Sequence, residues 1–200
     1  MLFRSGLSVP FVGTDNVTAA YKATEYLFSN GHTNICFMSP PPKNTSAIEE
    51  RIEGHLKYYS EQKTAVNNDL WLTDIQSTIP DQNTKSNIEK DIIRIKEHLE
   101  NNRSITAILA VEYQIALLAS RAIQSIGKSI PEDFSVVCFD APRTLLPDPF
   151  FTSIHQKEYE IGNRAFVMLL DFILNNENEE KVFLDTELDN GSSVRSILPR

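Results

Sequence analysis

Short apolar runs alternate with amphipathic stretches along almost the whole chain of 200 residues. The runs at 9–12, 35–38, 105–111 and 134–139 have the length and composition of buried strands. The stretches at 17–30, 46–62, 114–126 and 161–172 repeat apolar residues every three or four positions, as an amphipathic helix does. A strand that is apolar on both faces needs helices on both sides. The pattern therefore predicts an α/β fold built around a parallel sheet.

Polar residues at the starts of the predicted helices refine this outline. Asp15 or Asn16 can cap the first helix, because a short side-chain oxygen there accepts a free backbone N–H. A weak strand at 70–72 and a final strand at 181–188 complete the pattern. Capping-box spacing predicts two further helix starts, at Ser46 with Glu49 and at Ser86 with Glu89.

Charge and cysteine content narrow the class of protein. The net charge is −8 and no cluster of Lys or Arg is present, so these residues are poorly suited to bind nucleic acid directly. No apolar run approaches the roughly 20 residues that a membrane span needs, and residues 1–10 lack the apolar core of a signal peptide. Cys36 and Cys138 lie inside apolar runs, where a buried thiol is favoured over a disulfide. We expect a cytoplasmic protein.

The sequence lacks the familiar signatures of enzymes. It contains no Gly-rich phosphate loop, no paired-cysteine motif and no nucleophile elbow. The four histidines are scattered without metal-ligand spacing, and we expect His98 on a solvated helix face. We therefore predict no catalytic residue, no metal and no cofactor. One alternative remains open, a small enzyme that uses Asp140 and Glu112 as paired carboxylates at strand ends.

Three residues stand out as candidates for ligand binding. Asp140 ends a strand that is apolar on both faces, so it caps a turn or accepts hydrogen bonds from the hydroxyls of a polyol. Arg51 lies one turn inside a helix that follows a strand end, where it is either solvated or directed at a ligand. Trp71 is the only tryptophan, and its ring either packs in the core or stacks against the face of a sugar.

Three segments resemble the lactose/galactose repressor family of transcription regulators. Residues 129–140 read SIPEDFSVVCFD, which is similar to that family's "(I/V)PEDISVVGFD" segment. Residues 12–16, 23–27 and 31–35 resemble its "DN…A…A(T)xHLxxLGHxxI" stretch, and residues 152–165 resemble "TTIxQ…xIGxxA". The three segments keep the order and spacing of the family across nearly the whole chain.

The resemblance implies two periplasmic-binding-protein-like subdomains with a small effector, a sugar or sugar derivative, in the cleft between them. It also implies a homodimer that reaches operator DNA only through an N-terminal headpiece outside these residues. By position, Arg51, Asp140 and Gln156 match residues that contact the effector in the family. Trp71 falls near a place where some members have a sugar-stacking aromatic residue.

The sequence also departs from the family. Glu112-Tyr113 stands where the family has Asn-Asp, and an ionised Glu only accepts hydrogen bonds whereas Asn also donates them. A ligand would then need more donors, or a positive group, facing Glu112. Tyr113 and Thr45 complete the set of candidate ligand-binding residues.

The resemblance also gives the expected domain organisation. Residues 1–39 are expected to be a partial N-terminal subdomain, 40–149 the C-terminal effector-binding subdomain, 150–178 a crossover with a returning helix, and 179–200 a final strand and tail. Apolar surface should be exposed where the rest of the N-terminal subdomain would pair. A periplasmic-type sugar receptor of the same fold is the alternative function. The lack of a signal peptide and the repressor-like sequence of residues 131–140 disfavour this alternative.

Overall fold

The fold is described from a computed structural model, for residues 10–142, 149–175 and 181–199. Val9, which was expected to begin the first strand, lies outside these ranges. In chain order, the elements are β1 (Phe11–Thr14), α1 (Asn16–Ser29), β2 (Ile35–Met38), α2 (Ser46–Glu61), α3 (Lys85–Asn101), β3 (Ala107–Ala110), α4 (Tyr113–Ser125), β4 (Ser135–Phe139), β5 (Thr152–His155), α5 (Glu158–Asn175), β6 (Lys181–Leu184) and β7 (Glu187–Asp189).

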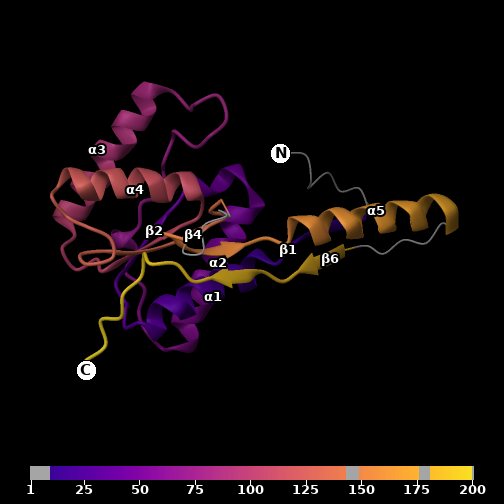
Figure 1. The fold of residues 1–200 in the computed structure, drawn as a ribbon, viewed down its shortest axis with the longest axis horizontal. Helices are drawn as coiled ribbons and strands as arrows, with labels where there is room; N and C mark the ends of the chain where they lie inside the picture. The colour runs from indigo at the N-terminus through magenta and orange to yellow at the C-terminus, as the bar shows by residue number, and fades with distance from the viewer. Residues whose placement is uncertain (1–9, 143–148, 176–180, 200) are drawn as a thin grey trace.

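A five-stranded sheet of order β2-β3-β4-β5-β7 forms the main body. Its first four strands are parallel, and β7 runs antiparallel to β5. Every residue of β2, β3, β4 and β5 is buried; the apolar runs predicted this for β2, β3 and β4, whereas β5 was not expected as a strand. The helices α1 and α2 pack together on one side of the sheet and α3 and α4 on the other, which gives a three-layer α/β body (Figure 1). Cys36 and Cys138 are buried free thiols in this core.

A smaller part of the chain extends away from this body. It consists of a two-stranded parallel sheet, β1 with β6, and the long helix α5, which packs on β1 (Figure 1). Most apolar side chains of α5 are exposed, and Met168 is the buried one among its described residues. The large exposed side chains on this helix are Tyr159, Phe166, Val167, Leu169, Leu170, Phe172, Ile173 and Leu174.

The sheets do not follow the expected division at residue 39. The strand β2 is hydrogen-bonded to β3 in the main sheet, and α1 packs on α2, so both belong to the main body. The expected final strand at 181–188 is also divided, because Lys181–Leu184 pairs with β1 while Glu187–Asp189 pairs with β5. An apolar run shows that a strand is buried but does not show which sheet it joins.

Two helix starts differ from the predicted capping boxes. The hydroxyl of Thr45 caps α2 by accepting the N–H of Ile48, and Thr84 caps α3 by accepting the N–H of Asn87. The capping threonine lies one residue before Ser46 in α2 and two residues before Ser86 in α3, the serines that were expected to cap these helices. The predicted weak strand at 70–72 is reduced to a single bridge between Met38 and Leu72.

The last residues of the chain tie the main body together. The Oγ of Ser193 donates to the carbonyl of Val136 in β4 and accepts the N–H of Thr152 in β5. At Gly191 an added Cβ would lie 2.4 Å from the carbonyl carbon of Phe151, so only glycine fits there. This segment therefore has a structural role.

The close contact of α1 with α2 depends on Gly54. A Cβ added there would lie 2.0 Å from the carbonyl oxygen of Val17 and 3.0 Å from the backbone N of Tyr21. The two helices can approach this closely only because the side chain is missing.

We predict that Gly54→Ala lowers the free energy of unfolding by roughly 1–3 kcal/mol, because the two helices must separate to make room. Gly162→Ala in α5 is the matched control, since an added Cβ there meets nothing within 4 Å and alanine favours a helix by up to about 1 kcal/mol. Chemical denaturation of the two variants measures both effects. Equal stability of the two variants would show that the helix contact is not tight.

Candidate functional site

The carboxyl ends of β3 and β4 bring two predicted site residues to the same edge of the sheet. Ala110 is in register with Cys138, and Glu112 and Asp140 each follow two residues later. Ligands of open parallel sheets bind at this edge, outside the ends of the strands.

The guanidinium of Arg51 reaches this edge from α2. Arg51 is only 7% exposed, and it lies over the ring of Phe139 with 3.9 Å between the guanidinium carbon and the ring centroid. Its Nε donates to Oδ1 of Asn16 at 3.0 Å, and its Nη1 donates to the carbonyl of Val111. Its Nη2 lies 3.9 Å from Oδ2 of Asp140.

Burial has the largest effect on the pKa of Arg51. It lowers the pKa of the guanidinium, while the carboxylates of Asp140, Glu112 and Glu50 raise it. Arginine starts from so high a value that it stays charged. The site therefore holds one buried cation among three acidic side chains.

Asp140 has a left-handed backbone conformation, with φ at 55°. Asp adopts this conformation more readily than most residues, because its short polar side chain can hydrogen-bond locally. Both of its carboxylate oxygens accept from Gln156, Oδ1 from the backbone N–H at 3.3 Å and Oδ2 from Nε2 at 2.8 Å. The Oε1 of Gln156 in turn accepts from the hydroxyl of Thr14 at 2.6 Å. Gln156 thus joins the end of β4 to the end of β1.

Glu112 precedes α4 and makes no capping bond with its side chain. Burial raises the pKa of its carboxyl group, and the charge of Asp140 raises it further. The hydroxyl of Thr78 and the charge of Arg51 act in the opposite direction.

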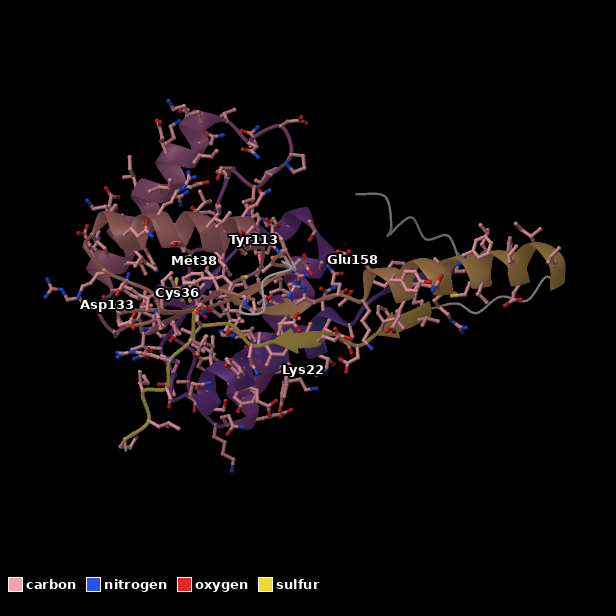
Figure 2. All side chains as sticks on the ribbon, in the orientation of Figure 1. Lys22, Cys36, Met38, Tyr113, Asp133 and Glu158 are labelled. Atoms are coloured by element: carbon pink, nitrogen blue, oxygen red, sulfur yellow. The ribbon has the colours of Figure 1, made fainter. Side chains whose placement is uncertain are left out.

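A cavity of about 410 Å³ adjoins Asp140 and Gln156, where the main body meets the start of α5. Figure 2 shows Tyr113 on the main body and Glu158 at the start of α5, on either side of this junction. The cavity is lined by Asp140, Ala141, Pro142, His155, Gln156, Lys157, Glu158, Tyr159, Glu160 and Glu187.

The structure brings together four of the seven predicted site residues: Arg51, Asp140, Glu112 and Gln156. Trp71 is partly buried and packs against the core, with its ring centroid 5.3 Å from that of Phe37 and 5.6 Å from that of His55. Tyr113 packs edge-on against Phe151 at 5.9 Å, beside a second cavity of about 500 Å³. The hydroxyl of Thr45 caps α2, as described above.

Sequence reasoning missed Asn16, Glu50 and Thr14 as parts of the site. Asn16 receives the Arg51 hydrogen bond, and its Nδ2 donates to Oε2 of Glu50 at 3.1 Å. The available signal was its place at the first position of a helix directly after a strand. That position also suits a helix cap, which is how Asn16 was interpreted.

His55 and His98 have structural roles. Burial lowers the pKa of His55 to about 3, so it stays neutral, with Nδ1 2.8 Å from the hydroxyl of Thr24. His98 was expected to be solvated, but its Nε2 lies 2.9 Å from the carbonyl of Leu70. Among the described residues, no three His, Cys, Asp or Glu side chains are grouped as metal ligands.

Ser153, His155 and Asp189 lie together but do not have the geometry of a catalytic triad. Nε2 of His155 contacts both the hydroxyl of Ser153, at 2.7 Å, and the carboxylate of Asp189, at 3.3 Å. A triad needs the acid on the other ring nitrogen, so that Nε2 is free to take the serine proton. This cluster gives no support to a hydrolase.

Comparison with known proteins identifies this architecture. Residues 24–194 match the family model described as "Periplasmic binding protein-like domain". The HTH-type transcriptional repressor PurR of Vibrio campbellii is 31% identical over 166 residues, which cover 82% of this chain and 46% of the repressor. The chain thus spans about half the length of the curated relatives it matches.

Two solved structures share the fold. The complex of the transcriptional regulator CelR with cellobiose superimposes with a TM-score of 0.76 at 23% identity, covering 93% of this chain and 54% of CelR. A LacI-family transcriptional regulator from Enterococcus faecium with bound ribose gives a TM-score of 0.75 at 22% identity, covering 94% of this chain and 66% of that protein. No helix in the described part of the chain is long and apolar enough to span a membrane.

Arg51→Met should lower the free energy of unfolding by roughly 2 kcal/mol or more, because it leaves the buried carbonyl of Val111 without a donor. Lys128→Met is the control, since the Lys128 side chain is 51% exposed and pairs with Asp133 at the surface, where an ion pair contributes about 1 kcal/mol or less. Urea denaturation measures the free energy of unfolding of both variants. A loss for Arg51→Met no larger than for Lys128→Met would contradict the central place of this guanidinium.

Proposed function

The chain belongs to the periplasmic binding protein-like domain family, in the form found in LacI/GalR regulators, and we propose that it binds the small-molecule effector of such a regulator. The observation that carries the proposal is the convergence of Arg51, Asp140, Glu112 and Gln156 at one edge of the sheet. Binding, with no chemical step, is the proposed activity.

A polyol fits the chemistry of this edge. The carboxylate of Asp140 can accept hydrogen bonds from ligand hydroxyls, and charge-assisted bonds of this kind are about twice as strong as neutral ones. Arg51 holds the neighbouring strand ends rigidly, so the acceptor is preorganised. The relatives bound to cellobiose and ribose support a sugar or sugar derivative as the ligand.

The site also lies where binding can alter the arrangement of the two parts of the chain. Three segments cross between them, following β1, β5 and β6, and Gln156 lies in the second crossover. A ligand that competes for Asp140 would change the bond from Gln156 and, through it, the contact with Thr14. We propose that this change controls a DNA-binding headpiece outside these residues, in the cytoplasm.

The exposed apolar face of α5 indicates how the smaller part is completed. Parallel sheets are normally covered on both faces, yet β1 and β6 form only a pair and α5 carries many exposed apolar side chains. Because the curated relatives are about twice as long, we propose that further strands and helices of the same regulator pack here. A palindromic operator requires a symmetric dimer, so a homodimer is part of the proposal.

Thermal-shift measurements against a panel of pentoses and hexoses test the function. We expect at least one sugar to raise the melting temperature. Asp140→Asn should weaken its binding about tenfold, because the charge is lost while the left-handed backbone is tolerated. Asp74→Asn, at the surface ion pair with Arg94, should leave binding unchanged. Full binding by Asp140→Asn would refute the assignment of the site.

The apolar face of α5 predicts self-association of this chain on its own. Leu169 is 54% exposed and Ile173 is 65% exposed. The double variant Leu169→Lys with Ile173→Lys should therefore bind less of a dye that fluoresces on exposed apolar surface, and its sedimentation coefficient should fall. Ile93→Lys on α3 is the control, because Ile93 is 54% exposed but lies outside this face. If the unsubstituted chain is a monodisperse monomer that does not bind the dye, this contradicts the proposal that further parts of the regulator cover the apolar face of α5.

A further inference from the structure

Asn16 is the first residue of α1, yet its side chain does not cap that helix. Asp15 caps it, because its Oδ1 accepts the backbone N–H of Thr18 at 2.9 Å. The side chain of Asn16 is buried and is hydrogen-bonded instead to Arg51 and Glu50, two consecutive residues of α2. The start of α1 therefore does not account for the contacts of this amide.

The amide of Asn16 lies between a positive and a negative side chain. Its Oδ1 accepts from Nε of Arg51 at 3.0 Å, and its Nδ2 donates to Oε2 of Glu50 at 3.1 Å. An amide carries an acceptor and a donor side by side without a net charge. Turned over, it would set its N–H groups against the N–H of Arg51 and its oxygen against the carboxylate of Glu50. Its two neighbours therefore fix its orientation.

This bridge leaves one end of the guanidinium directed at the ligand edge. Among the described residues, Arg51 forms an ion pair with Asp140, 3.9 Å from Nη2, and none with Glu50. Nε and Nη1 donate to Asn16 and Val111, whereas Nη2 donates to no described residue. Nη2 is therefore the group of Arg51 that can donate to a ligand beside Asp140.

We propose that Asn16 is a positioning residue for ligand binding, which holds the carboxylate of Glu50 away from Arg51 so that the guanidinium faces Asp140 and the ligand. The inference rests on the proposed function and adds a residue that acts on the ligand through Arg51. Without the amide, Nε of Arg51 and the carboxylate of Glu50 would each lose a partner. A direct pair between them is a strong charge-assisted contact, and it would draw the guanidinium away from Asp140.

Asn16→Leu tests the proposal, because leucine keeps the approximate shape of asparagine and removes both amide contacts. Calorimetry measures the binding of D-ribose and of cellobiose, and NMR follows the Nε–H signal of Arg51 without any ligand. We expect both sugars that bind the original chain to bind about tenfold more weakly. The signal should move downfield, because a carboxylate replaces an amide as the acceptor.

Adding Glu50→Gln to Asn16→Leu removes the competing charge. The affinity should return to within about threefold of that of the original chain, and the Nε–H signal should move back. Glu53→Gln is the matched control, because Glu53 is an exposed residue on the same helix and its substitution should restore nothing. A purely structural loss in Asn16→Leu would not be relieved by removing one carboxylate.

A second test keeps the net charge and both hydrogen bonds. Asn16→Asp with Glu50→Gln exchanges the amide and the carboxylate, so that a carboxylate lies directly on Nε of Arg51. If Asn16 were only a structural link, this exchange would leave binding unchanged. The proposal predicts that binding weakens by about threefold or more, because the guanidinium is then paired on the side away from the ligand.

Unchanged binding by the exchanged variant overturns the inference and leaves the proposed function intact. A loss in Asn16→Leu that Glu50→Gln does not relieve also overturns it. If neither sugar binds the original chain, that result counts against the sugar-binding function, and the NMR signal alone decides the inference. A signal that Asn16→Leu leaves in place overturns it, and a displaced signal that Glu50→Gln returns supports it.

Discussion

The buried guanidinium of Arg51 holds together segments that are far apart in the sequence. It contacts the first residue of α1, the residue that follows β3, and the ring and carboxylate at the end of β4. A buried charge is costly unless hydrogen bonds and opposite charges compensate for it, so these segments must meet at Arg51 in a defined geometry. The edge of the sheet proposed to bind the ligand is therefore shaped by the groups that compensate the charge of this one buried cation.

The crossovers connect that edge to the rest of the chain. Asp140 is bonded to Gln156, and Gln156 to Thr14, so a polar path runs from the edge of the main sheet to the end of β1. The left-handed backbone at Asp140 turns the carboxylate toward the second crossover. The proposed ligand site and the connection between the two parts of the chain therefore share the side chain of Gln156.

Much of this arrangement could be predicted from the sequence. The apolar runs at 35–38, 105–111 and 134–139 predicted three of the four buried strands of the main sheet, and the position of Asp140 after the last of them placed it at the carboxyl edge of the sheet. The division between the parts could not be predicted, because β2 is apolar whichever sheet it joins. Asn16 was missed for a similar reason, since the same residue type serves as a helix cap and as the acceptor for a buried arginine. Trp71 shows the limit of residue type alone, because its partly buried ring packs against the core.

The pairing of β1 with β6 has a consequence for how the protein is made. Phe11 is among the first described residues to leave the ribosome, yet its strand partner Lys181 follows 170 positions later (181 minus 11). At typical rates of synthesis of about 5–20 residues per second, β1 must wait on the order of 10–30 s for its partner. The strands β2, β3, β4 and β5 are synthesised during that interval, so four of the five strands of the main sheet can pair before β6 exists, and β7 follows β6. The small sheet therefore forms later than most of the main sheet, and β1 needs protection until residues 181–184 have been synthesised.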